Sequence, residues 1–288
     1  MVCNLIADAG STKIQWALID AADGYMKPFR TIGINALTAS DREVEEVLSE
    51  VAGKCPDDAE ITSVQYYGAG CSTEEICRKM ESAISLHLGC THVEAHSDLV
   101  GAARSLLGSE KGVACILGTG SNSCLYDGHR IISNTPSLGY VIGDEGSGNA
   151  IGRRLLSDYF KKRMPENIAR RFSCLPASDL TTALHKIYRE HGANRWLASL
   201  AEFAAENVDD DYIRATVKDE FSRFIERNVS PYSALANLHD LPICFTGGVA
   251  SGFANLLGDV CSEHGLNLGR ITREPMEGLV KEWLMTRP

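Results

Sequence analysis

The sequence lacks the features that would place the protein in a membrane or on a nucleic acid. No apolar run reaches the length of about 18 residues that a membrane-spanning helix requires. Basic residues are scarce, because 28 lysines and arginines stand against 38 aspartates and glutamates and leave a formal net charge of −10. That charge disfavours a nucleic-acid backbone or an anionic membrane surface as a partner.

A secretory signal is missing from the start of the sequence. No basic segment precedes the short apolar stretch 5–7, which runs directly into Asp8. A signal peptide needs both a basic region and a longer apolar region. We therefore expect a cytoplasmic protein.

The cysteines do not have the spacing of a metal site or a disulfide framework. Among the ten cysteines, the closest pairs are Cys71 with Cys77 and Cys115 with Cys124, which match neither Cys-x2-Cys nor the usual zinc patterns. Cys3 and Cys115 lie in apolar, strand-like segments, where a free thiol behaves as a small hydrophobic group. We expect reduced cysteines with a structural role.

Two common nucleotide-binding signatures are also absent. The sequence contains no Gly-x4-Gly-Lys-Ser/Thr and no Gly-x-Gly-x-x-Gly after a strand. Walker-type and dinucleotide-binding sites are therefore disfavoured.

One pattern occurs twice instead, at residues 5–20 and at residues 114–128. Each copy is an apolar strand that breaks at a Gly/Ser/Thr turn and resumes as an alternating strand. The first turn is Gly10-Ser-Thr-Lys13 and the second is Gly118-Thr-Gly-Ser-Asn-Ser123. Such turns present backbone N–H groups and small hydroxyls, as an anionic phosphate requires. Two of them facing each other predict a nucleotide held between two related domains.

Asp8 directly precedes the first turn. A carboxylate at the end of a strand can hold a hydrated magnesium ion while the turn amides contact phosphates. An ordinary hairpin with a turn-favouring aspartate is the alternative. Either turn alone leaves both interpretations open, and their duplication is stronger evidence than either motif.

Two further glycine-rich segments follow. Residues 139–152 hold five glycines around Asp144 and Glu145 and lead into a helix, which permits close approach of the backbone to a ligand. A flexible loop with an acidic residue near a helix start is the alternative. Residues 246–252 follow an apolar strand and would let an adenine or its ribose lie on the backbone, although one such turn is weak evidence.

The pattern of elements predicts an α/β protein of two domains. With 288 residues, 44% of them hydrophobic, the chain can bury a large core. Capping boxes are expected at Ser40 with Glu43 and at Ser72 with Glu75. Further strands are predicted at 25–33, 61–67, 92–95, 241–245 and 267–272, a mostly helical region at 146–228, and a last helix at 274–285.

Taken in order, these segments resemble the actin-like sugar kinase and Hsp70-type ATPase superfamily. They are most similar to the N-acetylglucosamine kinase branch of its BadF/BadG/BcrA/BcrD ATPase family. The resemblance covers nearly the whole chain. It rests on the order Asp8-x-Gly-Ser-Thr-Lys, Ser97-Asp98, Gly118-Thr-Gly-Ser-Asn, Gly143-Asp-Glu-Gly-Ser and Thr246-Gly-Gly-Val.

The resemblance implies two ribonuclease-H-like lobes that flank a nucleotide cleft. Residues 1–110 would form the N-terminal lobe, with the helix 274–288 packed back on it, and residues 111–273 the C-terminal lobe with a helical insertion. It further implies a homodimer that uses ATP and Mg²⁺ to phosphorylate an amino sugar, with N-acetylglucosamine 6-phosphate as the expected product.

The resemblance also assigns roles to individual residues. Asp98 would be the catalytic base facing the sugar 6-hydroxyl, and Asp8 would hold the metal. The implied sugar ligands are Asn35, Asp98, Gly139 and Asp144. The implied ATP contacts are Gly10, Ser11, Thr12, Lys13, Thr119, Gly120, Ser121, Gly247 and Gly248.

Several of these assignments keep an alternative. Asp98 follows a strand at a helix start, where the helix dipole would keep it ionised, but it could instead be a simple N-cap. Glu145 is the second candidate base, although its side chain and that of the adjacent Asp144 should point apart. Ala9 and Ser11 stand where the family usually has glycine, which puts the fit of the first turn in doubt.

Two other functions remain open. One is the activator ATPase of a 2-hydroxyacyl-CoA dehydratase-type system, which needs two cysteines presented to a cluster that bridges a dimer. The other is a nucleotide or sugar sensor without turnover. The sugar itself is open between N-acetylglucosamine, glucosamine, N-acetylmannosamine and N-acetylmuramic acid.

Overall fold

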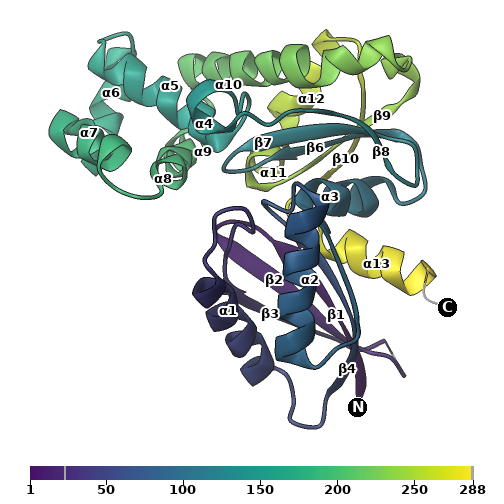
Figure 1. The fold of residues 1–288 in the computed structure, drawn as a ribbon. Coiled ribbons are helices and arrows are strands. Elements are labelled where there is room, and N and C mark those ends of the chain that lie inside the picture. The colour runs from purple at the N-terminus through teal and green to yellow at the C-terminus, as the bar shows by residue number, and fades with distance from the viewer. Residues whose placement is uncertain (23, 287–288) are drawn as a thin grey trace. The chain divides into compact units, whose positions relative to one another are not determined.

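The two predicted glycine-rich turns each join antiparallel strands within a five-stranded sheet (Figure 1). The fold is that of a computed structural model, which describes residues 1–22 and 24–286. The chain divides into two units. Unit 1 contains residues 1–108 and the chain from Pro275 onward, and unit 2 contains residues 109–274.

Unit 1 has the strand order β3-β2-β1-β4-β5. β1, β2 and β3 are antiparallel neighbours, whereas β4 and β5 run parallel to β1. The strands are β1 (Val2–Ala9), β2 (Lys13–Asp20), β3 (Met26–Ile32), β4 (Glu60–Gly68) and β5 (His92–Ser97). The helices are α1 (Asp41–Lys54), α2 (Glu74–Leu88), α3 (Asp98–Leu107) and α13 (Met276–Thr286).

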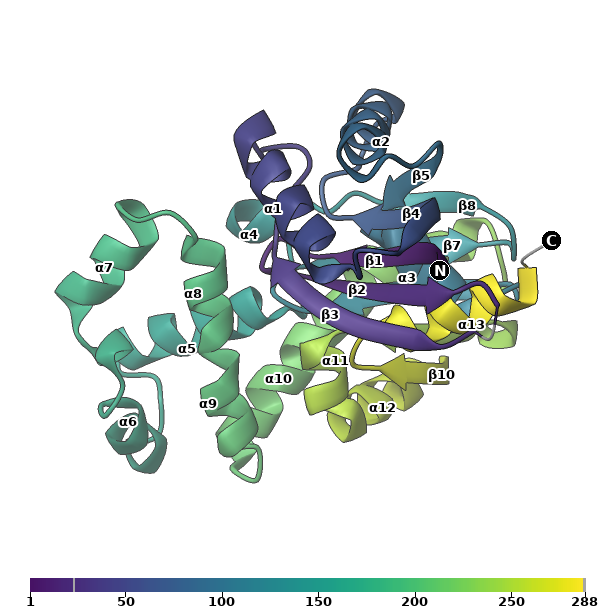
Figure 2. The same ribbon diagram turned by 90° about the horizontal axis from the view of Figure 1, so that it is seen from below.

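Both faces of this sheet are buried, because helices cover each of them (Figure 2). Successive side chains of a strand point to opposite faces. Leu5 and Ala7 of β1 therefore pack with the apolar faces of α1 and α2, while Ile6 packs with Leu279 and Trp283 of α13. The near-continuous apolar run of β1 reflects this burial on two sides.

Unit 2 repeats this topology with the order β10-β9-β6-β7-β8. Its strands are β6 (Gly112–Leu117), β7 (Ser121–Tyr126), β8 (Ile131–Thr135), β9 (Pro242–Thr246) and β10 (Asn267–Thr272). β6, β7 and β8 form the antiparallel part, and β9 and β10 run parallel to β6. β1 and β6 are thus equivalent, and the turn that follows each is the predicted glycine-rich turn.

A long helical region separates β8 from β9 in unit 2. Its helices α6 to α9 lie at the upper left of Figure 1. The α-helices are α4 (Gly139–Ile142), α5 (Gly148–Phe160), α6 (Glu166–Phe172), α7 (Leu180–Tyr188), α8 (Ala193–Ser199), α9 (Ala201–Glu206) and α10 (Asp211–Phe224). A π-helical turn, η2 (Ile225–Val229), continues α10, and the 3-10 turns are η1 (Pro176–Ser178), η3 (Ser230–Ala234) and η4 (Leu238–Asp240). α11 (Gly248–Gly252) and α12 (Ala254–Glu263) lie between β9 and β10.

The α/β class and most predicted elements are confirmed, with one cap displaced. Ser40 and Glu43 form the predicted capping box of α1. At α2, by contrast, Thr73 is the N-cap and its hydroxyl accepts from the backbone N–H of Ile76, so the prediction of Ser72 was wrong by one residue. Both residues are hydroxyl-bearing, and sequence preference alone does not separate two adjacent candidates.

The cysteines are free thiols, as expected from their spacing. Seven of the ten are buried, including Cys3, Cys115 and Cys244, and Cys174 is exposed. Within the described part of the chain no helix is long and apolar enough to cross a membrane.

A close contact between α13 and α3 generates the first prediction. A Cβ atom added at Gly278 would lie 2.3 Å from Ser105 Oγ and 2.4 Å from the Ser105 carbonyl oxygen. Gly278→Ala should therefore force α13 away from α3 and lower the free energy of unfolding by about 1–3 kcal/mol. Urea denaturation followed by circular dichroism measures this change.

Gly258→Ala in α12 is the matched control, because it is also a helical glycine but the added Cβ would meet only Leu268 Cδ2 at 3.4 Å. Alanine is the better helix former, so this variant should be neutral or more stable by up to about 1 kcal/mol. Equal stability of the two variants would contradict the predicted contact.

Candidate active site

The first glycine-rich turn is held by backbone packing from the chain that follows β3. Gly10 donates its N–H to the Lys13 carbonyl at 3.0 Å, and Gly33 donates to the Thr12 carbonyl at 3.1 Å. A Cβ at Gly33 would lie 2.3 Å from the Thr12 carbonyl carbon. Only glycine allows this approach, which leaves the Thr12 and Lys13 side chains exposed at the turn.

Asn35 lies next to this turn, as its implied role requires. Its Nδ2 donates to Ser11 Oγ at 3.4 Å, and its Oδ1 accepts from the Leu37 backbone N–H at 3.0 Å. Gly70, with a φ of +84°, would place a Cβ 2.1 Å from Asn35 Oδ1. The Asn35 side chain is therefore fixed by two neighbouring loops.

Asp8 and Asp98 lie at the same edge of the unit 1 sheet. Gly68 of β4 pairs with Ala9 of β1 and with Ser97 of β5, so the three strands end at the same edge of the sheet, with β4 between β1 and β5. The carboxyl ends of parallel strands are the usual place for ligand sites in α/β proteins. This register brings the candidate metal ligand and the candidate base to one edge.

Asp98 is not the N-cap of α3. Ser97 is the N-cap, and its Oγ accepts from the Val100 backbone N–H at 3.3 Å, so the capping alternative for Asp98 was wrong. Burial raises the pKa of Asp98, and hydrogen bonds from the backbone N–H groups of Leu99 and Asp98 itself offset part of this effect. The net direction is opposite to the one that the helix dipole alone predicts, because desolvation is the larger cause.

Tyr66 is a residue of this edge that sequence reasoning missed. Its side chain is 1% exposed, and its hydroxyl has no hydrogen-bond partner among the described residues. The ring lies over Gly68, where a Cβ would be 2.2 Å from Tyr66 Cε1. Burial first, and then the charges of Cys71, Asp98 and Asp8, raise the pKa of Tyr66 and keep its hydroxyl protonated.

The second glycine-rich turn, in unit 2, is bonded to the N-terminus of α5. Gly118 donates its N–H to the Gly120 carbonyl at 3.0 Å and accepts from Gly148 at 2.8 Å. Asn149 reaches the Thr119 carbonyl with its backbone N–H at 3.2 Å and with its Nδ2 at 2.7 Å. The turn and the start of α5 therefore form one hydrogen-bonded assembly.

Asp144 is directed at this turn. It has a φ of +59°, which is uncommon for a residue with a side chain. Its carboxylate is 7% exposed and accepts from Ser121 N at 3.3 Å, Ser137 Oγ at 3.3 Å and Asn149 Nδ2 at 2.8 Å. Gly139, the other implied sugar ligand of unit 2, has a φ of +72° and open space around its Cα.

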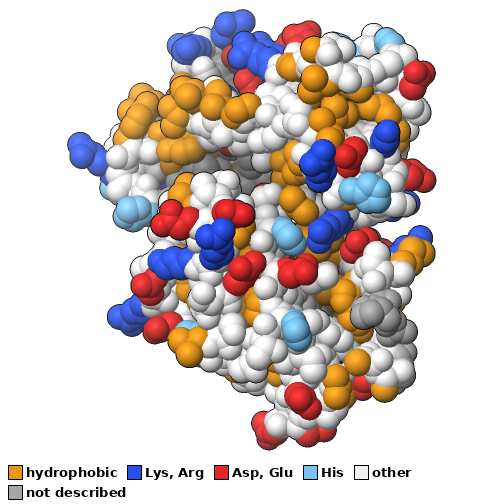
Figure 3. Space-filling view, turned by 45° about the vertical axis from the view of Figure 1, so that its right-hand side comes forward, with side chains coloured by type: hydrophobic (Ala, Val, Ile, Leu, Met, Phe, Trp, Pro, Cys, Tyr) orange, Lys and Arg blue, Asp and Glu red, His pale blue; other side chains and the backbone are white. Residues whose placement is uncertain are grey.

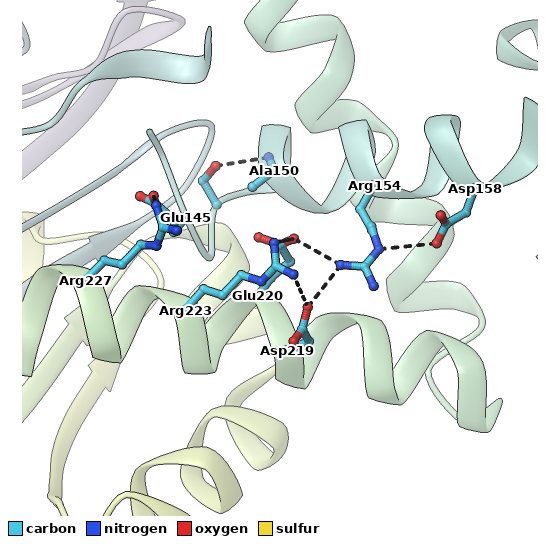
Figure 4. A network of polar contacts seen from close by, with 9 residues as sticks. Glu145, Ala150, Arg154, Asp158, Asp219, Glu220, Arg223 and Arg227 are labelled. Atoms are coloured by element: carbon cyan, nitrogen blue, oxygen red, sulfur yellow. Dashed lines mark hydrogen bonds and ion pairs between the residues drawn. The ribbon is translucent and has the colours of Figure 1, made fainter. Parts of the chain in front are cut away.

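Glu145 points away from Asp144, as expected for adjacent residues. Its Oε1 lies 3.2 Å from Arg227 Nη1 (Figure 4). Its Oε2 accepts from Asn228 Nδ2 at 3.4 Å. Both partners belong to η2. Nothing in the sequence pattern signals these partners, because they lie more than eighty residues along the chain.

A network of charges joins α5 to α10 behind this loop (Figure 4). Arg154 lies between Asp158, at 3.3 Å, and Asp219, at 3.0 Å. Glu220 lies 3.9 Å from Arg154, and its burial raises the pKa of its carboxyl group. These residues pair with one another, so we assign the network a structural role.

The glycines after β9 make an open turn. Gly247 has a φ of +123°, and a Cβ there would lie 2.2 Å from the Leu117 carbonyl oxygen. Gly248 begins α11 and has no heavy atom within 4 Å of the position that a Cβ would take. The backbone is therefore accessible at Gly248, as contact with a nucleoside requires.

The charged side chains form no large acidic or basic area on the face drawn in Figure 3, where acidic and basic groups lie among one another. The residues described in the structure also include no group of three or more His, Cys, Asp and Glu side chains that could hold a metal ion. A divalent cation would need ligands from its substrate and from water.

Two sheets of the same topology, each with a glycine-rich turn after its first strand, define an actin-like ATPase fold. The model of the BadF/BadG/BcrA/BcrD ATPase family matches residues 7–278. The chain belongs to this family of sugar-kinase-like ATPases.

Solved structures agree with this assignment. A protein of Porphyromonas gingivalis, provisionally named an N-acetylglucosamine kinase, is 35% identical, with both chains covered completely and a TM-score of 0.91. A protein of Chromobacterium violaceum with the same provisional name is 18% identical over 98% of each chain, with a TM-score of 0.72. A glucokinase of Streptomyces griseus, solved with glucose and AMPPNP, shares the fold at 14% identity over 99% of each chain, with a TM-score of 0.61. No protein with a curated description matches the chain.

The unpartnered hydroxyl of Tyr66 generates a second prediction. Removing a buried polar group that makes no hydrogen bond is neutral or favourable. Tyr66→Phe should leave the free energy of unfolding unchanged or raise it by up to about 1 kcal/mol. Thermal and urea denaturation of the ligand-free protein measure this.

Tyr67→Phe is the matched control on the same strand. Its hydroxyl accepts from Arg104 Nη1 at 2.8 Å, so its removal should cost about 1.5–3 kcal/mol, the usual range for a hydrogen bond to a charged group. A Tyr66→Phe variant that is destabilised as much as Tyr67→Phe would show that the Tyr66 hydroxyl does have a partner.

Proposed function

We propose that this protein transfers the γ-phosphate of ATP to the 6-hydroxyl of an amino sugar, with N-acetylglucosamine as the substrate. The observation that carries the proposal is the placement of Asp98 at the sheet edge that also carries Asp8 and the first glycine-rich turn. The 35% identical protein that is provisionally named an N-acetylglucosamine kinase supports the choice of sugar.

Asp98 is the proposed catalytic base. Phosphoryl transfer depends mainly on alignment and charge neutralisation, with one carboxylate to accept the alcohol proton. A bond forms between the sugar O6 and the γ-phosphorus, the bond from that phosphorus to the β-phosphate oxygen breaks, and the O6 proton passes to Asp98. The raised pKa makes Asp98 a stronger base than an ordinary aspartate, which favours this transfer.

The sugar is proposed to contact Asn35, Asp98, Gly139 and Asp144. Asn35 has its amide fixed beside the first turn by Ser11 and Leu37, so it can present a hydrogen-bonding group with little loss of entropy. A site that hydrogen-bonds ring hydroxyls rejects sugars that lack them more strongly than a missing methylene would.

The proposed ATP contacts come from three backbone turns. The phosphates would be bound at Gly10, Ser11, Thr12 and Lys13 in unit 1 and at Thr119, Gly120 and Ser121 in unit 2. The adenosine would be bound at Gly247 and Gly248, and the backbone is accessible at Gly248. Backbone N–H groups of such turns suit anions even in a chain with few basic residues.

Asp8 is the proposed protein ligand of Mg²⁺. One carboxylate, with no cluster of further ligands among the described residues, fits this ion, because Mg²⁺ keeps several waters and takes phosphate oxygens from its nucleotide. When bound, the ion would neutralise charge on the phosphates.

An assay of sugar-dependent ADP formation tests the proposed reaction. We expect turnover with N-acetylglucosamine in the presence of Mg²⁺, and slower turnover with glucosamine, N-acetylmannosamine and N-acetylmuramic acid. Phosphorus NMR of the product should show the 6-phosphate. A phosphate on the anomeric carbon, or no sugar-dependent ADP with any of the four, would contradict the proposal.

Substitution of Asp98 tests the base. Asp98→Asn should lower kcat by a factor of about 10² to 10⁴ and leave sugar and nucleotide binding nearly unchanged, because the amide has the same shape but accepts no proton. Glu94→Gln is the control, since Glu94 is an exposed carboxylate on β5, the strand that leads into Asp98, and it should retain kcat. An Asp98→Asn variant with normal kcat would pass the role to Glu145 or to no protein group.

The pH dependence of kcat/KM gives an independent check. Asp98 acts when deprotonated, so activity should fall as the pH drops through its raised pKa, at a higher pH than the value of about 3.9 for an ordinary aspartate. This acidic limb should be absent from the residual activity of Asp98→Asn. A limb of the same position in both proteins would assign it to another group.

A further inference from the structure

Asp144 is an implied sugar ligand, yet each of its observed contacts lies within unit 2 and most lead to the second glycine-rich turn. Oδ1 accepts from the Ser121 backbone N–H and from Ser137 Oγ, and Oδ2 accepts from Asn149 Nδ2. The same Nδ2 donates to the Thr119 carbonyl. The carboxylate is thus bonded to one end of the turn directly and to the other through Asn149.

The turn backbone also rests on this carboxylate. A Cβ at Gly120 would lie 2.9 Å from Asp144 Oδ2 and 3.1 Å from Asp144 Oδ1. The absence of a side chain at Gly120 is therefore what allows the turn to sit against Asp144. A carboxylate this close to a phosphate would repel it, unless its charge is taken up by donors as it is here.

Glu145 holds the other side of the same loop. Its carboxylate bonds Arg227 and Asn228 of η2, at 3.2 and 3.4 Å. The Asn228 carbonyl in turn accepts from Ser123 Oγ at 2.8 Å and from Thr135 Oγ1 at 3.0 Å. The π-helical turn thereby connects the loop to β7 and β8, and π-helical turns often occur at functional sites.

Gly146 completes the attachment of the loop to α10. It has a φ of +73°, and a Cβ there would lie 2.8 Å from Phe224 Cβ and 3.4 Å from the Glu220 carbonyl oxygen. Each of three consecutive residues thus contacts a different segment. Asp144 contacts the turn 118–121, Glu145 contacts η2, and Gly146 lies against the end of α10.

We propose that Asp144 and Glu145 are positioning residues that brace the turn 118–121 in its nucleotide-binding conformation, with Asp144 bonded to the turn and Glu145 anchoring the loop to η2. The role deepens the proposed function and rests on it only in naming ATP as the ligand. It adds to the proposed role of Asp144 as a sugar ligand, because it predicts an effect on nucleotide affinity when no sugar is present.

Nucleotide binding measured without sugar tests whether Asp144 and Glu145 hold the turn 118–121 in place. Titration calorimetry with Mg²⁺ and a non-hydrolysable ATP analogue should show that Asp144→Asn raises the Kd at least tenfold, because an amide cannot accept from both Ser121 and Asn149 without placing its own N–H groups against a donor. Gly120→Ala disturbs the same contact from the turn and should have a comparable effect.

Arg227→Gln keeps the test decisive should Asp144→Asn fold poorly, because the Arg227 side chain is 68% exposed and its replacement leaves the core intact. It should raise the Kd for the nucleotide about threefold. Glu145→Gln should add little to that loss, because the pair with Arg227 is already removed and the glutamine oxygen can still accept from Asn228. Asp219→Asn is the matched control on α10, where it pairs with Arg154 and Arg223 outside the loop, and it should leave nucleotide affinity unchanged.

Amide hydrogen exchange of the ligand-free protein gives a readout that needs no substrate. The Ser121 N–H should exchange faster in Asp144→Asn than in the wild-type protein, while amides of β9 keep their protection. Normal nucleotide affinity and normal exchange at Ser121 in Asp144→Asn would overturn the proposal and leave Asp144 with its role as a sugar ligand alone. If no sugar is phosphorylated, the proposed function is rejected. The nucleotide-binding and hydrogen-exchange results would still decide whether Asp144 and Glu145 hold the turn 118–121 in place.

Discussion

Close packing of backbone against backbone at the two glycine-rich turns is the constraint on which the candidate site depends. Gly33 packs under the first turn, against Thr12, and Gly247 packs under the second, against Leu117, at distances that no other residue could adopt without displacing the chain. The close approach of these glycines fixes the position of each turn through the backbone, and in unit 2 the side chains of Asp144 and Asn149 add hydrogen bonds to the turn.

Charge within the site follows from where the strands end. The parallel register of β1, β4 and β5 places Asp8, Tyr66 and Asp98 near one edge, and burial there raises the pKa of Asp98. In unit 2 the buried carboxylate of Asp144 is instead surrounded by donors, which compensate its charge. Desolvation thus dominates at Asp98 in unit 1, whereas hydrogen bonding dominates at Asp144 in unit 2. This difference suits the proposed roles of Asp98 as a base and of Asp144 as a residue that positions the turn.

Much of the fold could be predicted from local patterns. The strand β2, the apolar periodicity of α1 and its capping box at Ser40 follow from short-range rules, and the structure confirms them. The predicted alternation of β2 was wrong, because residues 14–19 are all buried in a sheet that helices cover on both faces. The displaced cap at Thr73 and the unpredicted strand β8 show the limit of those rules. β8 has few apolar residues and exists because it pairs with β7, an interaction that its own sequence does not signal.

The sequence by itself determined the duplication, the glycine-rich turns and the acidic residues beside them, because these depend on residue type and spacing within short segments. Only the tertiary structure decided what those acids face. Asp144 bonds the turn 118–121, Glu145 bonds η2, and Asp98 is desolvated rather than capping its helix. The contacts of Asp144 and Glu145 depend on partners brought from distant parts of the chain, and the raised pKa of Asp98 depends on its burial in the fold. Neither follows from the neighbouring residues in the sequence.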